Sequence, residues 1–269
     1  MSVLDPIRDS LSFALAAVVA AAHDALTALG ADPASGLVWL LSIAAVVLVV
    51  RLALLPLGVR GVRQAHAAAR ARPALQELTR RYRNRKDADS VRELLAERRR
   101  VSADHGLSRL GCLPLLLQLP VWFALYRLVT DVAAGTPVGA MTADLVVSLG
   151  AATLLGVPLA ERGYLGAGLS HLAVVAGLAA AAAALSYVTQ KYLVVPNTVT
   201  ADLPEAMARA QHLLPAVSAL GLLVAGSVVP VALLAYWVCN NLWTLAQSAV
   251  VWRWFPTPGT PAADRRLSR

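Results

Sequence analysis

Long apolar stretches that carry almost no charge constrain this chain more than any other feature of its sequence. Five of them approach or exceed the roughly 20 residues that an α-helix needs to cross about 30 Å of hydrocarbon. Pro114 and Pro120 lie inside the second stretch, and membrane helices tolerate proline where neighbours satisfy the freed carbonyls. The last two stretches adjoin, which predicts an antiparallel hairpin. The five stretches cover residues 36–57, 112–129, 168–189, 213–229 and 230–252.

Composition separates a membrane protein from a soluble protein with a large core. Hydrophobic residues make up 58% of the 269 residues, charged residues only 15%, and the mean hydropathy is +0.61. A soluble domain is nearer half apolar and a quarter charged, and a chain of this length is too short for a core that buries five such stretches. We therefore expect an all-α integral membrane protein of the inner (cytoplasmic) membrane, with a bundle of five transmembrane helices.

The distribution of Lys and Arg predicts the orientation. Residues 58–111 hold 14 of the 24 basic residues, the tail at 253–269 holds four, and residues 130–167 hold only Arg162. Because basic loops stay on the cytoplasmic side, the first loop and the tail are expected there and the N-terminus outside. The net charge of +8 then indicates anionic lipids, a ribosome surface or acidic segments of partner proteins, and not sequence-specific nucleic acid.

Two short apolar segments are less clear. Residues 11–22 follow a start of mixed charge (Asp5, Arg8, Asp9), which is not typical of a cleaved signal. We expect residues 1–35 to form a retained helix at the outer interface, the alternatives being a cleaved signal or an extra span. Residues 144–156 are expected to be interfacial or re-entrant; as a sixth span they would invert everything that follows.

The basic loop at 58–111 is predicted to form a cytoplasmic helical hairpin. Apolar residues recur at helical spacing in two segments, an acidic cluster can cap the second, and Gly106 can end it. The basic surface is either a solvated face that sets topology or a docking surface. The spaced residues are Leu75, Leu78 and Tyr82, then Val91, Leu94, Leu95 and Arg98, with Asp87, Asp89 and Ser90 at the cap.

Arg51 is the most informative single residue. It lies inside the first span, six positions before Leu57, where an arginine costs roughly 2.5 kcal/mol or more unless it meets water or a partner. The alternative is snorkelling, because Leu57 is only about 9 Å away along the helix axis.

Further polar residues fall within the predicted spans. Taken singly they are typical of structural hydrogen bonds between helices. No acidic residue lies in any of the five predicted spans. Together with Arg51, these polar residues therefore predict a water-filled cavity. The residues are Gln118, Ser186, Gln190, Asn240, Asn241 and Gln247. Cys112 and Cys239 lie in or beside apolar spans, so packing is expected and a disulfide is not.

Three motifs give the chain a specific resemblance. VVRLALLPL (residues 49–57), GCLPLLLQLPVWFALY (111–126) and PVALLAYWVCNNLWTLAQ (230–247) resemble, in order and spacing, the YidC-type membrane protein insertase family, over about residues 5–254. The resemblance implies a five-helix core with its N-terminus outside. It also implies a hydrophilic groove that is open to the cytoplasm and to lipid but closed on the outer side.

The resemblance also implies roles for residues. Arg51 matches the groove arginine, which would attract acidic residues in the tail of a nascent membrane protein. We call that nascent protein the client. Its apolar segment would slide along the second and fifth helices into lipid, without nucleotide or cofactor. Tyr236 and Trp237 match the family's aromatic pair, and the ribosome and the Sec translocon are further candidate partners.

Two departures from the family pattern favour a specialised paralogue. Ser108-Arg109 stands where relatives have Asn-Pro, and Ser186 where they often have glutamine. A channel or small-solute transporter, with Arg51 on an anion path, is the alternative function, although the inverted repeats typical of transporters are not evident. The sequence GLSH at residues 168–171 lacks the motif context of a serine nucleophile, so an intramembrane protease is disfavoured.

Overall fold

The computed structural model describes residues 5–85, 87–107, 113–166, 168–199 and 205–267. These residues are mostly helical, as expected. The helices and strands are α1 (Asp5–Ala28), α2 (Gly36–Arg81), α3 (Ala88–Asp104), α4 (Leu113–Ala133), α5 (Ala143–Ala151), β1 (Thr153–Leu154), β2 (Val157–Pro158), α6 (Gly168–Val188), the π-helix η1 (Thr189–Val194), the 3₁₀-helix η2 (Val195–Asn197), α7 (Glu205–Ala225), α8 (Val231–Trp254) and α9 (Pro261–Leu267).

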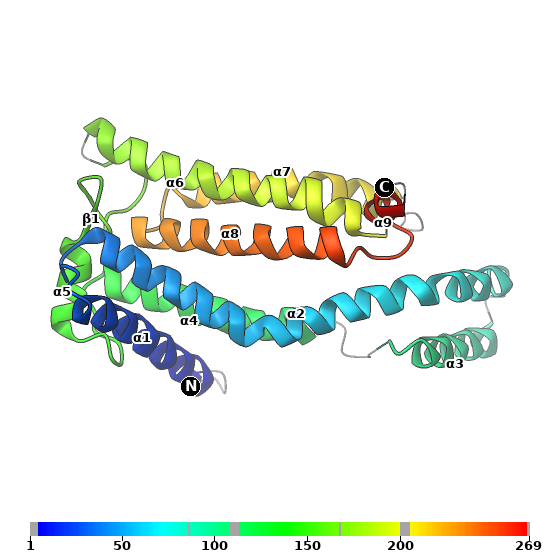
Figure 1. Cartoon of the computed structure of the whole chain (residues 1–269). Helices are drawn as coiled ribbons and strands as arrows, with labels where there is room; N and C mark the ends of the chain where they lie inside the picture. Colours follow the sequence, from blue (N-terminus) through cyan, green and yellow to red (C-terminus); the bar gives the residue numbers. More distant parts are fainter. Residues whose placement is uncertain (1–4, 86, 108–112, 167, 200–204, 268–269) are drawn as a thin grey trace.

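The long helices form two layers with α8 between them (Figure 1). One layer contains α6 and α7, and the other contains α1, α2 and α4; α8 contacts α6 on one side and α2 on the other. We call the two ends of this bundle the α5 end and the α3 end. The N-termini of α2 and α8 both lie at the α5 end (Figure 1), so these two helices run parallel.

The side chains that face away from the core identify the bundle as a membrane protein. Soluble proteins rarely expose contiguous apolar patches of more than a few hundred Å². Here α7 exposes a continuous apolar face, and α2 exposes another over its first half. The exposed residues are Leu213, Leu214, Val217, Leu220 and Val224 on α7, and Leu41, Leu48, Val49, Leu52 and Leu55 on α2.

By length and composition, three helical stretches of the described residues are long and apolar enough to cross a membrane. They are Asp9–Ala28, Gly36–Arg81 and Gly168–Asn197. The helix α8 is long enough, at 24 residues, but Asn240, Asn241 and Gln247 interrupt its apolar run. The stretch Asp9–Ala28 lies in α1, so α1 is also long and apolar enough to span a membrane. Its interfacial position and the alternative of an extra span therefore both stay predictions.

The helix α2 differs from its expected form. The first span was expected over residues 36–57, and α2 extends beyond it as one helix of 46 residues with Pro56 and Pro73 inside it. A proline removes one backbone hydrogen bond and bends a helix without necessarily ending it, and α2 is visibly bent in Figure 1. The first span and the first arm of the hairpin therefore belong to one continuous helix.

The helix α3 lies beside the second half of α2 (Figure 1). Leu78 and Tyr82 are buried in this contact, and the Tyr82 hydroxyl donates to the Glu97 carboxylate at 3.5 Å. The predicted apolar stripe of α3 is largely exposed, however, with Leu95 49% accessible. The two arms are thus joined by one narrow seam.

The segment after α4 is too short to be a sixth span. Its helix α5 has nine residues, about 14 Å, against about 30 Å of hydrocarbon. The antiparallel pair β1–β2 follows, with Thr153 opposite Pro158. This pair is the one departure from an all-α fold within the described residues.

The helices α7 and α8 follow one another and were expected to form an antiparallel hairpin, but in the described residues they do not pack closely on each other. The helix α7 packs chiefly on α6, and α6 packs on α8. Residues 159–163 lie beside the end of α7 and the start of α8. The backbone N–H groups of Val231 and Ala232 in α8 donate to the carbonyls of Glu161 and Leu159 at 2.9 Å. Gly163 contacts the Ser227 backbone so closely that a Cβ there would lie 2.5 Å from the carbonyl oxygen.

Candidate intramembrane polar site

Arg51 extends from α2 to α8 and is half-buried between them. Its Nε and one terminal nitrogen donate to Asn240 Oδ1, at 3.1 and 2.7 Å. The same terminal nitrogen donates to Thr244 Oγ1 at 2.9 Å. Asn240 and Thr244 lie one turn apart on α8, so they present two acceptors to one guanidinium. The side chain is thus held against α8 and does not extend along α2.

The acceptors of Arg51 are neutral. Among the described residues no carboxylate lies within ion-pair distance of its guanidinium. A half-buried cation with neutral partners retains its full charge, which water or a transient anion must balance. The site is therefore suited to attract a carboxylate.

A cavity of about 390 Å³ extends from Arg51 toward the α3 end. Small residues on α2, Gly58 and Gly61, leave room for it; a Cβ on Gly58 would lie 2.9 Å from Gln247 Nε2. The described lining is mixed, with polar groups from three parts of the chain. These polar groups are Thr244, Gln247 and Ser248 on α8, Asn197 and Thr198 at η2, and Thr257 in the C-terminal segment.

The C-terminal segment lies at the mouth of this cavity. The Thr257 N–H donates to Asn197 Oδ1 at 2.7 Å, and both residues line a second cleft of about 730 Å³. That cleft lies between α2 and the segments of Asn197 and Thr257, and its basic residues are Arg72 and Arg80 of α2 and Arg98 of α3. The polar cavity therefore adjoins a basic cleft at the α3 end.

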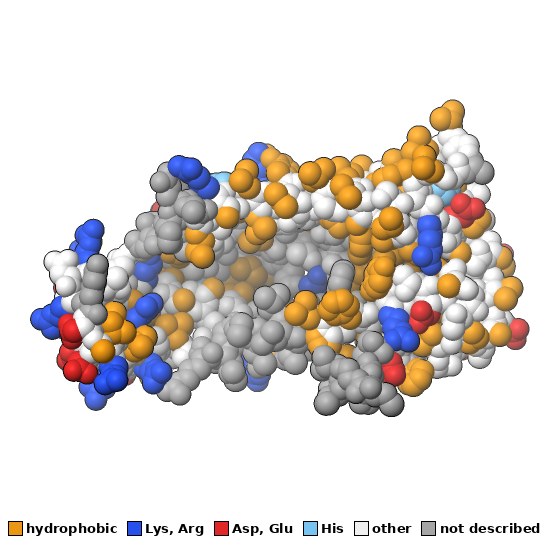
Figure 2. Space-filling model, turned by 180° about the vertical axis from the view of Figure 1, so that it is seen from behind, with side chains coloured by type: hydrophobic (Ala, Val, Ile, Leu, Met, Phe, Trp, Pro, Cys, Tyr) orange, Lys and Arg blue, Asp and Glu red, His pale blue; other side chains and the backbone are white. Residues whose placement is uncertain are grey.

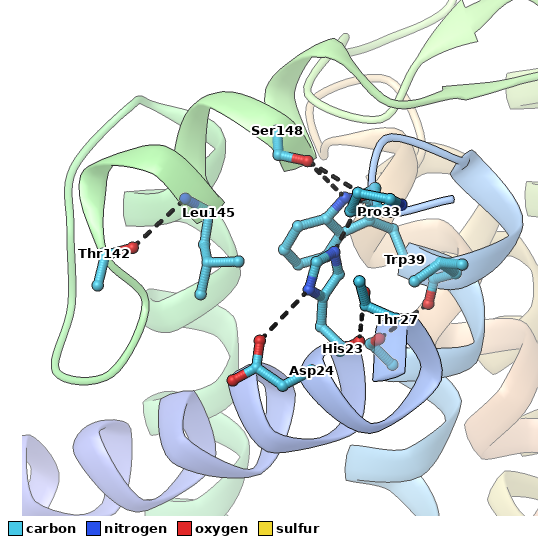
Figure 3. A network of polar contacts seen from close by, with 10 residues as sticks. His23, Asp24, Thr27, Pro33, Trp39, Thr142, Leu145 and Ser148 are labelled. Carbon is cyan, nitrogen blue, oxygen red and sulfur yellow. Dashed lines mark hydrogen bonds and ion pairs between the residues drawn. The ribbon is translucent and has the colours of Figure 1, made fainter. Parts of the chain in front are cut away.

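The α5 end of the bundle is densely packed. Trp39 at the start of α2 is fully buried, and its indole N–H donates to Ser148 Oγ of α5 at 3.2 Å. Ser148 donates in turn to the Pro33 carbonyl, which also accepts from the buried His23 ring of α1 at 3.0 Å. Figure 3 shows these side chains pointing toward one another, and they tie α1, α2 and α5 together.

The face of the molecule opposite to the view of Figure 1 has a depression. Figure 2 shows this depression below the layer of α6 and α7, with apolar side chains along its upper rim. Basic side chains gather at the α3 end in the same view.

The structure brings together only some of the predicted site residues. Arg51 and Asn240 bond directly, and Gln247 lines the same cavity while accepting from Trp243 at 3.0 Å. Asn241 donates to the carbonyl of Trp237, one turn back on its own helix. Trp237 is half-buried against the core.

Other predicted residues lie elsewhere. Tyr236 is 7% exposed and belongs to the hydrophobic core. Ser186 accepts from Gln190 at 3.0 Å, and Gln190 accepts from Ser218 of α7 at 3.4 Å, so this pair joins α6 to α7. The Gln118 side chain, Cys112 and Ser108-Arg109 lie outside what the structure describes. Cys239 is a half-buried free thiol.

Sequence reasoning missed several residues of the site. Thr244 follows Asn240 by four positions, so helical spacing alone would have placed it beside Arg51. Asn197, Thr198 and Thr257 reach the cavity only through the tertiary fold, and no local pattern marks them.

No enzyme-like cluster is evident in the described part of the chain. No group of three His, Cys, Asp or Glu side chains is arranged to hold a metal. His171 bonds to the Gly163 carbonyl at 2.8 Å and lies 3.3 Å from the Glu161 carboxylate, so it anchors the loop that precedes α6.

These features define a class: a multi-pass protein of the cell membrane with an arginine in a polar cavity between its helices. Comparison with known proteins gives the family. Residues 31–258 match the family described as the 60Kd inner membrane protein, and the chain belongs to this family, that of YidC.

The relatives are bacterial proteins named as insertases. The chain is 32% identical to the membrane protein insertase YidC of Streptomyces avermitilis over 249 residues, 89% of this chain but only 56% of that protein. It is 27% identical to YidC of Tropheryma whipplei, over 92% of this chain and 84% of the relative. It is also 27% identical to the insertase MisCA of Bacillus subtilis, over 78% and 69%.

Proposed function

We propose that this protein is a membrane protein insertase. It captures the acidic tail and adjoining apolar segment of a nascent membrane protein at the Arg51 cavity and releases the apolar segment into lipid. The observation that carries the proposal is a cationic side chain held among neutral acceptors in a polar intramembrane cavity. The names of the relatives support the same activity.

Electrostatics explain the capture step. A client carboxylate that replaces Asn240 as the partner of Arg51 gains about 4 kcal/mol of attraction at 4 Å in a surface-like environment. Desolvation of both charges opposes most of this gain, so the complex forms and dissociates readily. The release step needs no nucleotide, because transfer of an apolar helix of about 20 residues into hydrocarbon is itself favourable.

The proposed topology has five spans, the N-terminus outside and the α3 end in the cytoplasm. The basic residues support this orientation, since most of them lie in the α2–α3 hairpin and the tail. In this orientation the basic cleft faces the side on which clients are made. The hairpin then offers a surface for anionic lipids, a ribosome or the Sec translocon.

A channel is the alternative, and it requires a path through the α5 end. Among the described residues, the network around Trp39 and Ser148 joins α1, α2 and α5 at that end. This packing favours a cavity with one opening over a conducting pore.

The proposal is tested by crosslinking during synthesis. A photoreactive residue is placed at Ser248, which lines the cavity, and a short single-span client with an acidic N-terminal tail is translated in the presence of membranes. Arg51→Ala should lower crosslinking and insertion about tenfold, the value expected for loss of a charge-assisted contact.

Two controls make this result specific. Arg70→Ala removes an exposed cation of α2 outside the cavity and should leave insertion unchanged. A client whose acidic tail residues are replaced by amides should insert equally poorly with and without Arg51. Equal insertion of the acidic client by the Arg51→Ala variant would overturn the proposal.

A further inference from the structure

A further cavity lies on the α2–α8 pair beside the Arg51 cavity, with which it shares Gly58, Val62, Gln247 and Val251. It has a volume of about 620 Å³ and, among the described residues, an almost wholly apolar lining. Leu55, Val59 and Val62 contribute from α2, and Trp243, Val250 and Phe255 from α8 and its end. A cavity of this size is in the range that holds a small ligand.

The cavity continues along α2 as an open groove. The groove of about 400 Å³ contains Leu52 and Pro56 and shares Leu55, Val59 and Arg63 with the cavity. The result is one elongated apolar channel on the membrane-facing side of α2, a shape that suits a linear hydrocarbon chain better than a compact molecule.

Basic groups lie at one end of this channel. Arg60 and Arg63 are exposed at its rim, and neither pairs with a carboxylate among the described residues. The His66 ring bonds to the Phe255 carbonyl at 3.1 Å and joins the two helices at that end. An anionic group is therefore the expected companion of the hydrocarbon chain.

The depth of these groups agrees with a lipid. From Gly36 to Arg60 is 24 residues, about 36 Å along the helix, slightly more than the thickness of the hydrocarbon layer. Arg60 and Arg63 thus lie at the level of the phosphates, and Leu52 to Val59 lie among acyl chains of the same leaflet.

We infer that this channel binds one anionic phospholipid of the leaflet at the α3 end, with an acyl chain against Val59 and Trp243 and the phosphate at Arg60 and Arg63. A zwitterionic head group would bring its own cation next to these arginines, so the site prefers a lipid with net negative charge. The inference requires that α2 spans the bilayer; it does not require that Arg51 captures clients, although the two cavities adjoin.

The test is native mass spectrometry of the full chain, released from detergent with phosphatidylglycerol and phosphatidylcholine in equal amounts. One phosphatidylglycerol should remain bound where phosphatidylcholine does not. Each basic side chain near a lipid surface is worth roughly fivefold in affinity, so the double variant Arg60→Gln, Arg63→Gln should bind about 25-fold more weakly.

Two further variants separate a site from general attraction. Ala246→Phe fills the cavity and should abolish retention although both arginines remain, and Arg70→Gln, outside the channel, should retain the lipid. Equal retention of the two lipids by the unaltered chain, or undiminished phosphatidylglycerol binding by the double arginine variant, would overturn the inference.

Discussion

At the scale of the residue, Arg51 donates three hydrogen bonds to two side chains of α8, and both acceptors are uncharged. These contacts fix the direction of the guanidinium without neutralising it. Asn240 is the central acceptor, since it receives two of the three bonds. Its neutrality is therefore as important to the proposed capture as the charge of Arg51.

Asn240→Asp tests this point with almost no change of shape. The new carboxylate would pair with Arg51 permanently and compete with the acidic residues of a client. We expect crosslinking of acidic clients to fall roughly tenfold, with folding unchanged. Thr244→Val, which removes an acceptor and adds no charge, is the matched control and should have a much smaller effect. Normal capture by Asn240→Asp would contradict the role of an unpaired Arg51.

At the scale of the element, glycines of α2 separate close packing from open space. A Cβ on Gly36 would lie 1.9 Å from the Thr153 carbonyl oxygen of β1, whereas a Cβ on Gly61 meets nothing within 4 Å. The first contact is with backbone and cannot be relieved by a rotamer change.

The same substitution should therefore have opposite effects at the two positions. Gly36→Ala should lower the free energy of unfolding by about 1–3 kcal/mol, the usual cost of overpacking, and Gly61→Ala should raise it by about 0.5–1 kcal/mol through its higher helix propensity. Thermal unfolding in one detergent measures both. A Gly36→Ala protein as stable as the parent would show that β1 does not press on the start of α2.

The first turn of α3 depends on a titratable cap. The Ser90 N–H donates to the Asp87 carboxylate at 2.9 Å, and this bond holds the pKa of Asp87 below its ordinary range. Because the folded pKa is lower than the unfolded one, the stabilisation is present above about pH 4 and is lost as the pH falls further.

Hydrogen exchange of the first turn of α3 measures this dependence. Protection, corrected for the intrinsic effect of pH, should decrease in acid for the parent. Asp87→Asn retains a capping acceptor without a titratable group, so its protection should be independent of pH. Equal acid sensitivity of the two proteins would exclude Asp87 as the cause.

At the scale of the whole molecule, the sequence predicted the features that depend on composition and missed those that depend on contact. The length of the apolar stretches predicted the long helices, and the cost of burying a charge identified Arg51 as a candidate functional residue. That Asn240 is its partner could be seen only in the fold. The continuity of α2 through Pro56 was missed, because a proline is a weak signal where neighbours support the helix. The bonds between residues 159–161 and the start of α8 were also missed, because these residues lie about 70 positions apart in the sequence.

The mouth of the cavity shows the same limit. Thr257 reaches Asn197 across 60 positions, and neither residue stands in an informative pattern. The cavity could thus be predicted from Arg51 and the polar face of α8, but the residues that border its opening required the assembled fold.

The most direct test of the central claim is whether water reaches Arg51's cavity from one side. In a protein with Cys112 and Cys239 replaced by alanine, Ser248→Cys should react with a membrane-impermeant thiol reagent added from the cytoplasmic side, because the reactive thiolate forms only in contact with water. Leu242→Cys, on an exposed apolar position of the same helix, should stay unmodified. A Ser248→Cys protein as unreactive as Leu242→Cys would mean that the cavity is dry, and the account would fail.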